Sequence, residues 1–293
     1  ASLKAGRLGQ YDVAVPGDYM VEIMASQGLL DSFTPDALPN FGNIQDEWLD
    51  VPFDPGRKHS IPYQWGSTAF SVNRDVYQGD IDTLAIIFNP PQELRGRINV
   101  LDSQGEVLAL ASMYMGIPQC TQDREQLKAL MDMLLQAKAS WASFGSDIAK
   151  DVLVSGDAAA GMIYNGFSAK ARAEGANVEY AYPKEGAVVW MDNVVLLKDA
   201  PNRENALKFM NFLLEPENAA AVTNFVIMPL TLSERSIGTA CPSGGGGGRP
   251  QRHLGRLRAP RARVGLTRIR TRPREPPPPV TAPTTTTWPA AAV

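Results

Sequence analysis

The sequence of 293 residues contains only two cysteines and two histidines. Two cysteines exclude a disulfide framework or a cysteine-rich zinc module, and the histidines, His59 and His253, leave little for a histidine-based metal site. The longest apolar stretches, such as 84–88 and 194–197, are far shorter than the ~20 residues that a membrane-spanning helix needs. Because 44% of the residues are hydrophobic, the chain can still bury a core. We therefore expect one or two folded domains with no metal, no cofactor and no transmembrane helix.

The net charge of −3 conceals two segments of opposite charge. Residues 226–293 contain eleven arginines, two glutamates, no lysine and no aspartate, so this tail carries +9 and residues 1–225 carry −12. The tail also contains eleven of the 23 prolines and five consecutive glycines at 244–248. A segment of this composition cannot assemble a packed core and is typical of disorder.

Two interpretations of this Arg/Pro/Gly-rich tail are open. An Arg-rich segment can be an arm that binds nucleic acid or an anionic surface. After residue 226 the tail also lacks Asn, Lys, Tyr and Phe. Out-of-frame translation of a GC-rich gene would produce a segment of this composition. We favour the second interpretation, exclude 226–293 from the fold argument, and expect no nucleic-acid partner unless the tail is genuine. The chain begins at Ala1 without a methionine or signal segment, which we interpret as a start inside a domain.

Strand-like and helix-like stretches alternate over residues 1–225, which is the pattern of an α/β protein. Buried strands are expected at Tyr11–Val15, Phe70–Val72, Ile98–Leu101 and Gly161–Tyr164. Helices are expected at residues 19–30, at Glu106–Met115, which is apolar nearly all round and therefore central, and at Glu204–Leu214. A further amphipathic helix is predicted by apolar residues at i, i+3, i+4, i+7 and i+8, which are Leu127, Leu130, Met131, Leu134 and Leu135.

The motifs of the common enzyme classes are absent. The sequence has no glycine-rich phosphate loop, no HExxH and no nucleophile elbow. A Ser/His/Asp triad would need His59, which lies in a polar loop between Pro55 and Pro62. Cys120 could act as a nucleophile only with a base that the sequence does not offer, so a surface-loop thiol is the simpler interpretation. We therefore expect no enzymatic activity.

Six segments between residues 11 and 217 carry a family resemblance. They read YDVAVPGDY at 11–19, IPYQWGSTAFSVN at 61–73, RINVLDSQGEV at 97–107, AGMIYNG at 160–166, YPKEGAVVWMD at 182–192 and NALKFMNFLLEPE at 205–217. Each segment alone is weak, but together and in this order they resemble the polyamine-binding proteins, of spermidine/putrescine type, of bacterial ABC importers.

The resemblance implies a two-lobed periplasmic-binding-protein fold of type II-like topology, in which the chain crosses between the lobes twice. On that layout 1–73 and 193–225 form the first lobe and 74–192 forms the second, with the fold incomplete at both ends. The resemblance also implies a monomeric, periplasmic or membrane-anchored receptor. It would capture a polyamine such as putrescine or spermidine between the lobes and deliver it to the membrane permease of an ABC transporter.

The resemblance assigns the ammonium groups to Asp192 and Glu106, and the apolar chain of the ligand to Trp190, Tyr164 and Tyr19. Hydrogen bonds between carboxylates and ammonium groups are strong because they are charge-assisted, and aromatic rings attract cations through their quadrupole. Simpler interpretations are open for each residue. Asp192 could be an exposed residue at a strand end, Glu106 could close a capping box at a helix start, and the aromatic residues could be ordinary packing.

The sequence also departs from the family. Gly17 stands where the family has a serine, and Tyr164 stands where it has a tryptophan. Ser103 and Phe167 stand where spermidine-type and putrescine-type members, respectively, place an additional aspartate. These departures leave the ligand open, so a receptor of the same fold for another cationic or amino-bearing solute remains an alternative. A weaker alternative is an enzyme on a related two-lobed scaffold that uses Cys120.

Overall fold

A computed structural model describes residues 9–226, all of which lie in the first of two units into which the chain divides, Ala1–Gly245. The helices are α1 (Asp18–Ser26), α2 (Ala85–Phe88), α3 (Gln104–Met115), α4 (Arg124–Lys138), α5 (Ala149–Ser155), α6 (Asn165–Ala173), α7 (Arg203–Leu213) and α8 (Pro216–Val226). The strands are β1 (Val13–Ala14), β2 (Ser60–Asn73), β3 (Ile98–Val100), β4 (Trp141–Phe144), β5 (Ala160–Tyr164), β6 (Val178–Ala181) and β7 (Val188–Leu196). The α/β class is confirmed.

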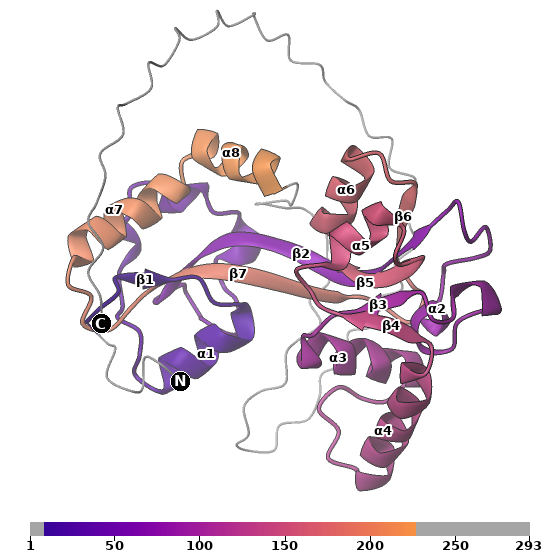
Figure 1. Cartoon of the computed structure of the whole chain (residues 1–293). Helices are drawn as coiled ribbons and strands as arrows, with labels where there is room; N and C mark the ends of the chain where they lie inside the picture. Colours follow the sequence, from indigo (N-terminus) through magenta and orange to yellow (C-terminus); the bar gives the residue numbers. More distant parts are fainter. Residues whose placement is uncertain (1–8, 227–293) are drawn as a thin grey trace, which may run out of the picture. The chain divides into compact units, whose positions relative to one another are not determined.

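The strands of this part of the chain form one mixed sheet in the order β1-β7-β2-β5-β3-β4, with β6 also paired to β2. β2 is antiparallel to β7 over residues 60–68 and to β5 and β6 over residues 68–73. β3 is parallel to both β4 and β5. In Figure 1, β2 and β7 run side by side from the group of helices α1, α7 and α8 to the group of helices α3, α4, α5 and α6. These two long strands therefore connect two separate groups of helices.

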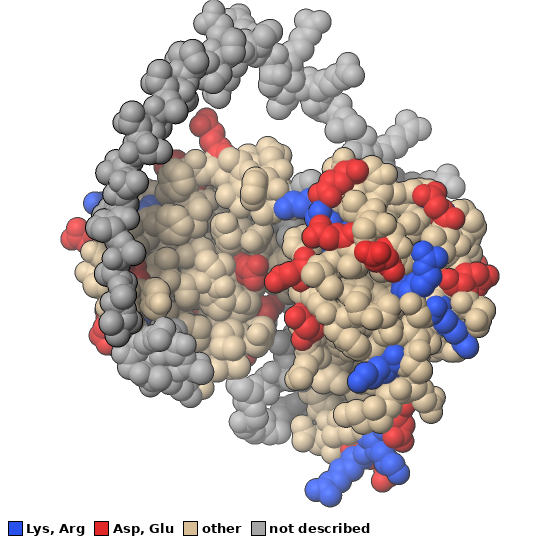
Figure 2. Space-filling model, viewed as in Figure 1, with Lys and Arg blue, Asp and Glu red and all other residues tan. Residues whose placement is uncertain are grey.

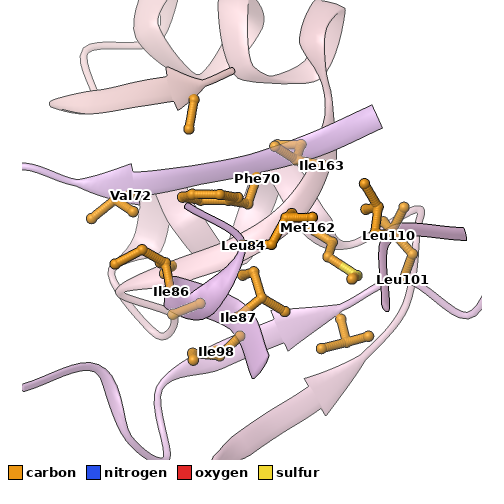
Figure 3. Close-up of a cluster of buried hydrophobic side chains, with 14 of the residues drawn as sticks. Phe70, Val72, Leu84, Ile86, Ile87, Ile98, Leu101, Leu110, Met162 and Ile163 are labelled. Carbon is orange, nitrogen blue, oxygen red and sulfur yellow. The ribbon is translucent and has the colours of Figure 1, made fainter. Parts of the chain in front are cut away.

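The largest group of buried apolar side chains packs around the far end of β2, and it defines the second lobe. Phe70 on β2 packs with Ile98 on β3, Leu110 on α3 and Met162 on β5 (Figure 3). All four side chains are fully buried. Burial of side chains of this size contributes about 1.5–3 kcal/mol each, so this cluster holds α2, α3, α5 and α6 against the sheet.

Two smaller clusters pack around the other end of β7, and they define the first lobe. Val194 and Leu196 pack on one face of the strand with residues of α7, whereas Val195 and Leu197 pack on the opposite face with residues of α1. Successive strand residues point to opposite faces, so β7 here is covered on both sides. The molecule is thus two-lobed, as predicted. The lobe boundaries after residues 73 and 192 stay a prediction.

Several local expectations need correction. The strand expected at 11–15 is reduced to β1, and its flanking Tyr11 and Val15 are each 52% exposed. α3 is not central, since Leu108 on it is 44% exposed. The amphipathic helix at 124–138 is confirmed, but Leu130 is the only buried residue of its predicted apolar stripe; three other members of the stripe are exposed, Leu127, Met131 and Leu135. In each case neighbouring elements bury fewer of the apolar side chains than the sequence pattern predicts.

None of the helices between residues 9 and 226 is long and apolar enough to span a membrane. Apart from Val226, which ends α8, the tail predicted for 226–293 lies outside the described residues, as does the start of the chain at Ala1.

Candidate functional site

A cavity of about 930 Å³ is lined by residues of α1, β2, α3, β5, α6, β7 and α8, which belong to both lobes. This volume is at the upper end of the range for small-molecule sites. Figure 2 shows Asp and Glu side chains on both sides of a hollow in the described surface. All five residues predicted for the site line the cavity, namely Tyr19, Glu106, Tyr164, Trp190 and Asp192. Their role as ligand contacts stays a prediction.

Strand alternation brings Trp190 and Asp192 to the same face of β7. Opposite them on β2 lie Gly66, which pairs with Trp190, and Gln64, which pairs with Asp192. A Cβ atom at Gly66 would lie 2.7 Å from Cζ2 of Trp190, so only glycine leaves room for the indole ring at this point. The register of β2 against β7 therefore sets the position of both predicted site residues.

The other face of β7 is fixed by a buried polar network. The fully buried Arg57 donates to Oδ1 of Asn193 at 2.7 Å, to Oγ of Ser60 at 3.1 Å and to the carbonyl oxygen of Trp48 at 2.7 Å. Burial lowers the pKa of Arg57 to about 10, although nearby Asp54 opposes that shift. Arg57 therefore ties the start of β2 to β7 on the face away from the cavity.

Glu106 lies in the first turn of α3 and is hydrogen-bonded by residues of other elements. The hydroxyl of Thr68 donates to its Oε1, and the hydroxyl of Tyr164 donates to its Oε2 at 3.1 Å. The indole Nε1 of Trp190 donates in turn to Oγ1 of Thr68 at 3.0 Å. The capping-box interpretation is wrong, because Ser103 stands at the N-cap without a side-chain hydrogen bond. Glu106 is instead held toward the cavity.

Aromatic rings form a continuous wall beside Glu106. The ring centroids of Trp190 and Tyr164 are 5.6 Å apart at an interplanar angle of 82°, and those of Tyr164 and Phe167 are 5.7 Å apart at 72°. Such edge-to-face pairs contribute about 0.5–1.5 kcal/mol beyond their burial. Burial, together with the charge of Glu106, raises the pKa of Tyr164, so its phenol stays protonated as a donor. Tyr19, on α1, is 54% exposed at the cavity.

The Asp192 carboxylate differs from that of Glu106, since no donor among residues 9–226 hydrogen-bonds to it. Burial raises the pKa of Asp192 to about 6, and the charges of Asp18 and Glu106 add to that shift. Burial likewise raises the pKa of Asp18, against hydrogen bonds from the backbone of Tyr19 and Met191. This end of the cavity therefore carries negative charge that a bound cation would neutralise.

Other lining residues were not predicted as site residues from the sequence. They include Asp18, Gln64 and Lys170, as well as Ser103 and Phe167, which the sequence analysis treated only as departures from the family. Asp18 could have been suspected because it directly precedes Tyr19 after a strand end. Gln64 carries no local signal, since its position depends on pairing with β7.

Neither residue considered for catalysis belongs to the cavity lining. The ring of His59 lies 2.9 Å from the carbonyl oxygen of Asp31. Cys120 is disulfide-bonded, so the surface-thiol interpretation is wrong and the sulfur cannot act as a nucleophile in this state. Among the described residues, no group of three or more His, Cys, Asp or Glu side chains is arranged to hold a metal ion.

Comparison with known proteins places this geometry in a family. Residues 1–232 match the sequence model described as "Bacterial extracellular solute-binding protein". The chain belongs to the bacterial extracellular solute-binding proteins. The match extends beyond residue 226, where the tail was predicted to begin. The members of this family are binding proteins of transporters, in accord with the two-lobed fold.

Relatives in this family have names that state a ligand. The chain is 35% identical over 230 residues to the spermidine/putrescine-binding periplasmic protein of Escherichia coli, covering 78% of this chain and 66% of that protein. It is 34% identical over 246 residues to the putrescine-binding periplasmic protein SpuD of Pseudomonas aeruginosa, covering 78% and 67%. The chain thus spans about two thirds of the length of these relatives.

Similarity to a solved structure supports the same family assignment as these two sequence relatives. The spermidine/putrescine ABC transporter substrate-binding protein of Streptococcus pneumoniae superposes with a TM-score of 0.67 at 28% identity, covering 78% of this chain and 71% of that one. The fold and the family assignment therefore rest on sequence and structure together.

Proposed function

We propose that this solute-binding protein captures a polyamine, such as putrescine or spermidine, outside the cytoplasmic membrane and delivers it to the permease of an ABC importer. Support comes from its family, and from relatives in Escherichia coli and Pseudomonas aeruginosa that are named for these ligands. The protein acts by binding alone, as a monomer, without catalysis and without a nucleic-acid partner.

One observation carries the proposal, namely that two carboxylates and a wall of aromatic rings line the same cavity. A polyamine is an apolar chain with ammonium groups at its ends, so its site needs acceptors for the ends and rings beside the methylene groups. Each ring over an ammonium group contributes about 0.5–2 kcal/mol. The charge of −12 on residues 1–225 also attracts cations to the protein.

In this proposal Asp192 and Glu106 bind the ammonium groups, and Trp190, Tyr164 and Tyr19 contact the methylene chain. Tyr19 belongs to α1 in the first lobe, whereas Glu106 belongs to α3 in the second. A ligand that contacts both lobes would stabilise their closure about the two crossing strands, β2 and β7.

Calorimetric titration of the full chain with putrescine and with spermidine tests this function. We expect saturable binding that is lost in Asp192→Ala and retained in Asp132→Ala, a matched control that removes an exposed carboxylate from α4. The difference follows because only Asp192 lines the cavity. Binding that persists in Asp192→Ala, or no binding by a folded wild-type protein, would contradict the proposal.

Lys170 favours a second candidate, a solute that carries both an amino group and an anionic group. Lys170 lines the cavity, and its ammonium group lies 5.9 Å from the ring centroid of Phe167, another lining residue. A positive charge here would repel an ammonium end and attract a carboxylate. Titration with 4-aminobutyrate beside putrescine distinguishes the two candidates. Tighter binding of 4-aminobutyrate, lost in Lys170→Met, would favour the second; preference for putrescine would exclude it.

A further inference from the structure

Charged residues are distributed unequally around the cavity. Its acidic lining residues come from α1, α3 and β7, and they are Asp18, Glu22, Glu106 and Asp192. Helices α6 and α8 contribute Phe167, Lys170 and Val226 to the lining, but no carboxylate. In Figure 1 the last turn of α8 lies beside α6. The part of the cavity beside these two helices is therefore lined by apolar side chains and one cation.

Lys170 is half-buried and forms no ion pair with a carboxylate of residues 9–226. Glu174, four residues along the chain and so placed to pair with it, is bound at 2.8 Å by Lys150 instead. The Lys170 ammonium group lies near two rings, 5.9 Å from the centroid of Phe167 and 5.4 Å from that of Phe225 on α8. Because aromatic rings attract cations at such distances, these rings hold the positive charge beside the cavity.

Lys170 continues the aromatic wall formed by Trp190, Tyr164 and Phe167. Tyr164, Phe167 and Lys170 are spaced three residues apart at the start of α6 and therefore follow one face of it. A helix rises about 1.5 Å per residue, so Lys170 lies about 9 Å farther along the axis than Tyr164. Tyr164 is the residue that donates to Glu106. An arm of a ligand that continued along the rings past Glu106 would therefore approach Lys170.

We propose that Lys170 is a specificity-determining residue that disfavours a third ammonium group and so restricts the ligand to a diamine. Putrescine has two ammonium groups, for which Asp192 and Glu106 are the proposed partners. Spermidine has a third, on an arm that would bring a positive charge toward Lys170 where α6 and α8 offer no carboxylate. The inference rests on the proposed function in taking the ligand to be a polyamine, and it deepens that function by selecting between two polyamines.

The test compares spermidine with N-butylputrescine by calorimetric titration of the full chain. These ligands have the same length and differ in one terminal group, which is an ammonium group in spermidine and a methyl group in N-butylputrescine. The wild-type protein should bind N-butylputrescine about tenfold more tightly, because two cations a few ångströms apart in a partly solvated site repel each other on this scale. Lys170→Met keeps the length of the side chain but removes its charge, and should abolish the difference. Putrescine affinity should change by less than about threefold, since both ammonium groups of putrescine bind elsewhere.

Two further variants separate the charge of Lys170 from its packing. Lys170→Arg retains the charge and should retain the preference for N-butylputrescine over spermidine, which a role in packing alone does not predict. Lys128→Met, at an exposed position on α4, is the matched control and should leave all three affinities unchanged. An equal gain for spermidine and N-butylputrescine in Lys170→Met would indicate a steric effect and would overturn the inference.

The outcomes distinguish this inference from the proposed function. If putrescine binds but Lys170→Met leaves the affinity ratio of spermidine to N-butylputrescine unchanged, the polyamine function stands and the role of Lys170 is overturned. If the two analogues are distinguished through Lys170 but putrescine does not bind, the role of Lys170 stands without that function. If the folded wild-type protein binds none of the three amines, both fail.

Discussion

The two ends of the cavity hold their carboxylates in opposite ways. Glu106 already accepts hydrogen bonds from the hydroxyls of Thr68 and Tyr164, whereas Asp192 accepts none from the described residues and lies near a second carboxylate, Asp18. The first end is therefore preorganised and internally satisfied before a ligand arrives. At the second end the charges of Asp192 and Asp18 repel each other, and this repulsion is relieved by a bound cation or by protonation of Asp192. This difference indicates that the charge of the ligand contributes most to binding at Asp192.

The largest expected effect is on putrescine affinity, and it comes from neutralising the two carboxylates of the cavity in separate variants. Asp192→Asn should weaken binding of putrescine by about 100-fold, and Glu106→Gln by about tenfold, because Glu106 shares its oxygens with two protein donors. Calorimetric titration measures both, with Asp132→Asn as the control for loss of an exposed carboxylate. A larger loss of putrescine affinity in Glu106→Gln than in Asp192→Asn would contradict the difference proposed between the two ends of the cavity.

The link between the two ends is Trp190, which donates to Thr68 and lies two residues from Asp192. Gly66→Ala should displace its indole ring, since the new Cβ atom would lie within 3 Å of the ring and of Oδ1 of Asn165. We expect a loss of about 1–3 kcal/mol in the free energy of unfolding, as for other overpacked sites, together with weaker putrescine binding. Denaturant unfolding and titration measure the two effects. An unchanged affinity would show that the ends act independently.

Stability without ligand should change in opposite directions at the two ends. The pKa of Asp192, about 6, exceeds the ordinary value of 3.8, so its favourable contribution is complete below pH 3.8 and is lost as the pH rises through 6. At pH 7.5 Asp192→Asn should therefore raise the free energy of unfolding by about 1–2 kcal/mol, discounted for partial exposure.

Glu106→Gln should instead lower the free energy of unfolding at pH 7.5 by about 1–2 kcal/mol, because it weakens two hydrogen bonds to a charged group. Thermal and urea unfolding of the unliganded variants at pH 7.5 measure the two signs. The gain in Asp192→Asn should shrink at pH 4, where the wild-type carboxyl group is protonated. Equal signs for the two variants at pH 7.5 would contradict the contrast between the ends.

The smallest expected effect is the pH dependence of binding. A cation binds the ionised form of Asp192, so lowering the pH from 7.5 to 5, through the pKa of about 6, should weaken putrescine binding by about tenfold. The dependence should vanish in the residual binding of Asp192→Asn. Titration at both pH values measures it, and a constant wild-type affinity would show that Asp192 does not contact the cation.

The hydrophobic spacing along the sequence predicts a helix or strand correctly where the residues of that element alone determine its structure. The helix at 124–138 follows from apolar spacing, and the strand at 160–164 from its apolar run between turns. The same spacing does not predict how far a side chain is buried, because burial depends on the elements that pack against it. Leu127 and Leu130 belong to the same stripe, but only Leu130 is covered by the second lobe. Spacing shows that a helix has an apolar face, but it does not show how wide a surface will cover that face.

The sequence by itself determined the α/β class, the family resemblance and five residues that line one cavity, because short motifs and helical or strand periodicity are properties of neighbouring residues. Only the tertiary structure decided how those residues are held. The Ser103–Glu106 spacing predicts a local capping box, yet Glu106 bonds to Thr68 and Tyr164, which lie 38 and 58 residues away. In the same way, the β2–β7 register brings Gln64 to Asp192. The physical reason is that hydrogen-bond partners are selected by strand register and lobe packing, which no local spacing encodes.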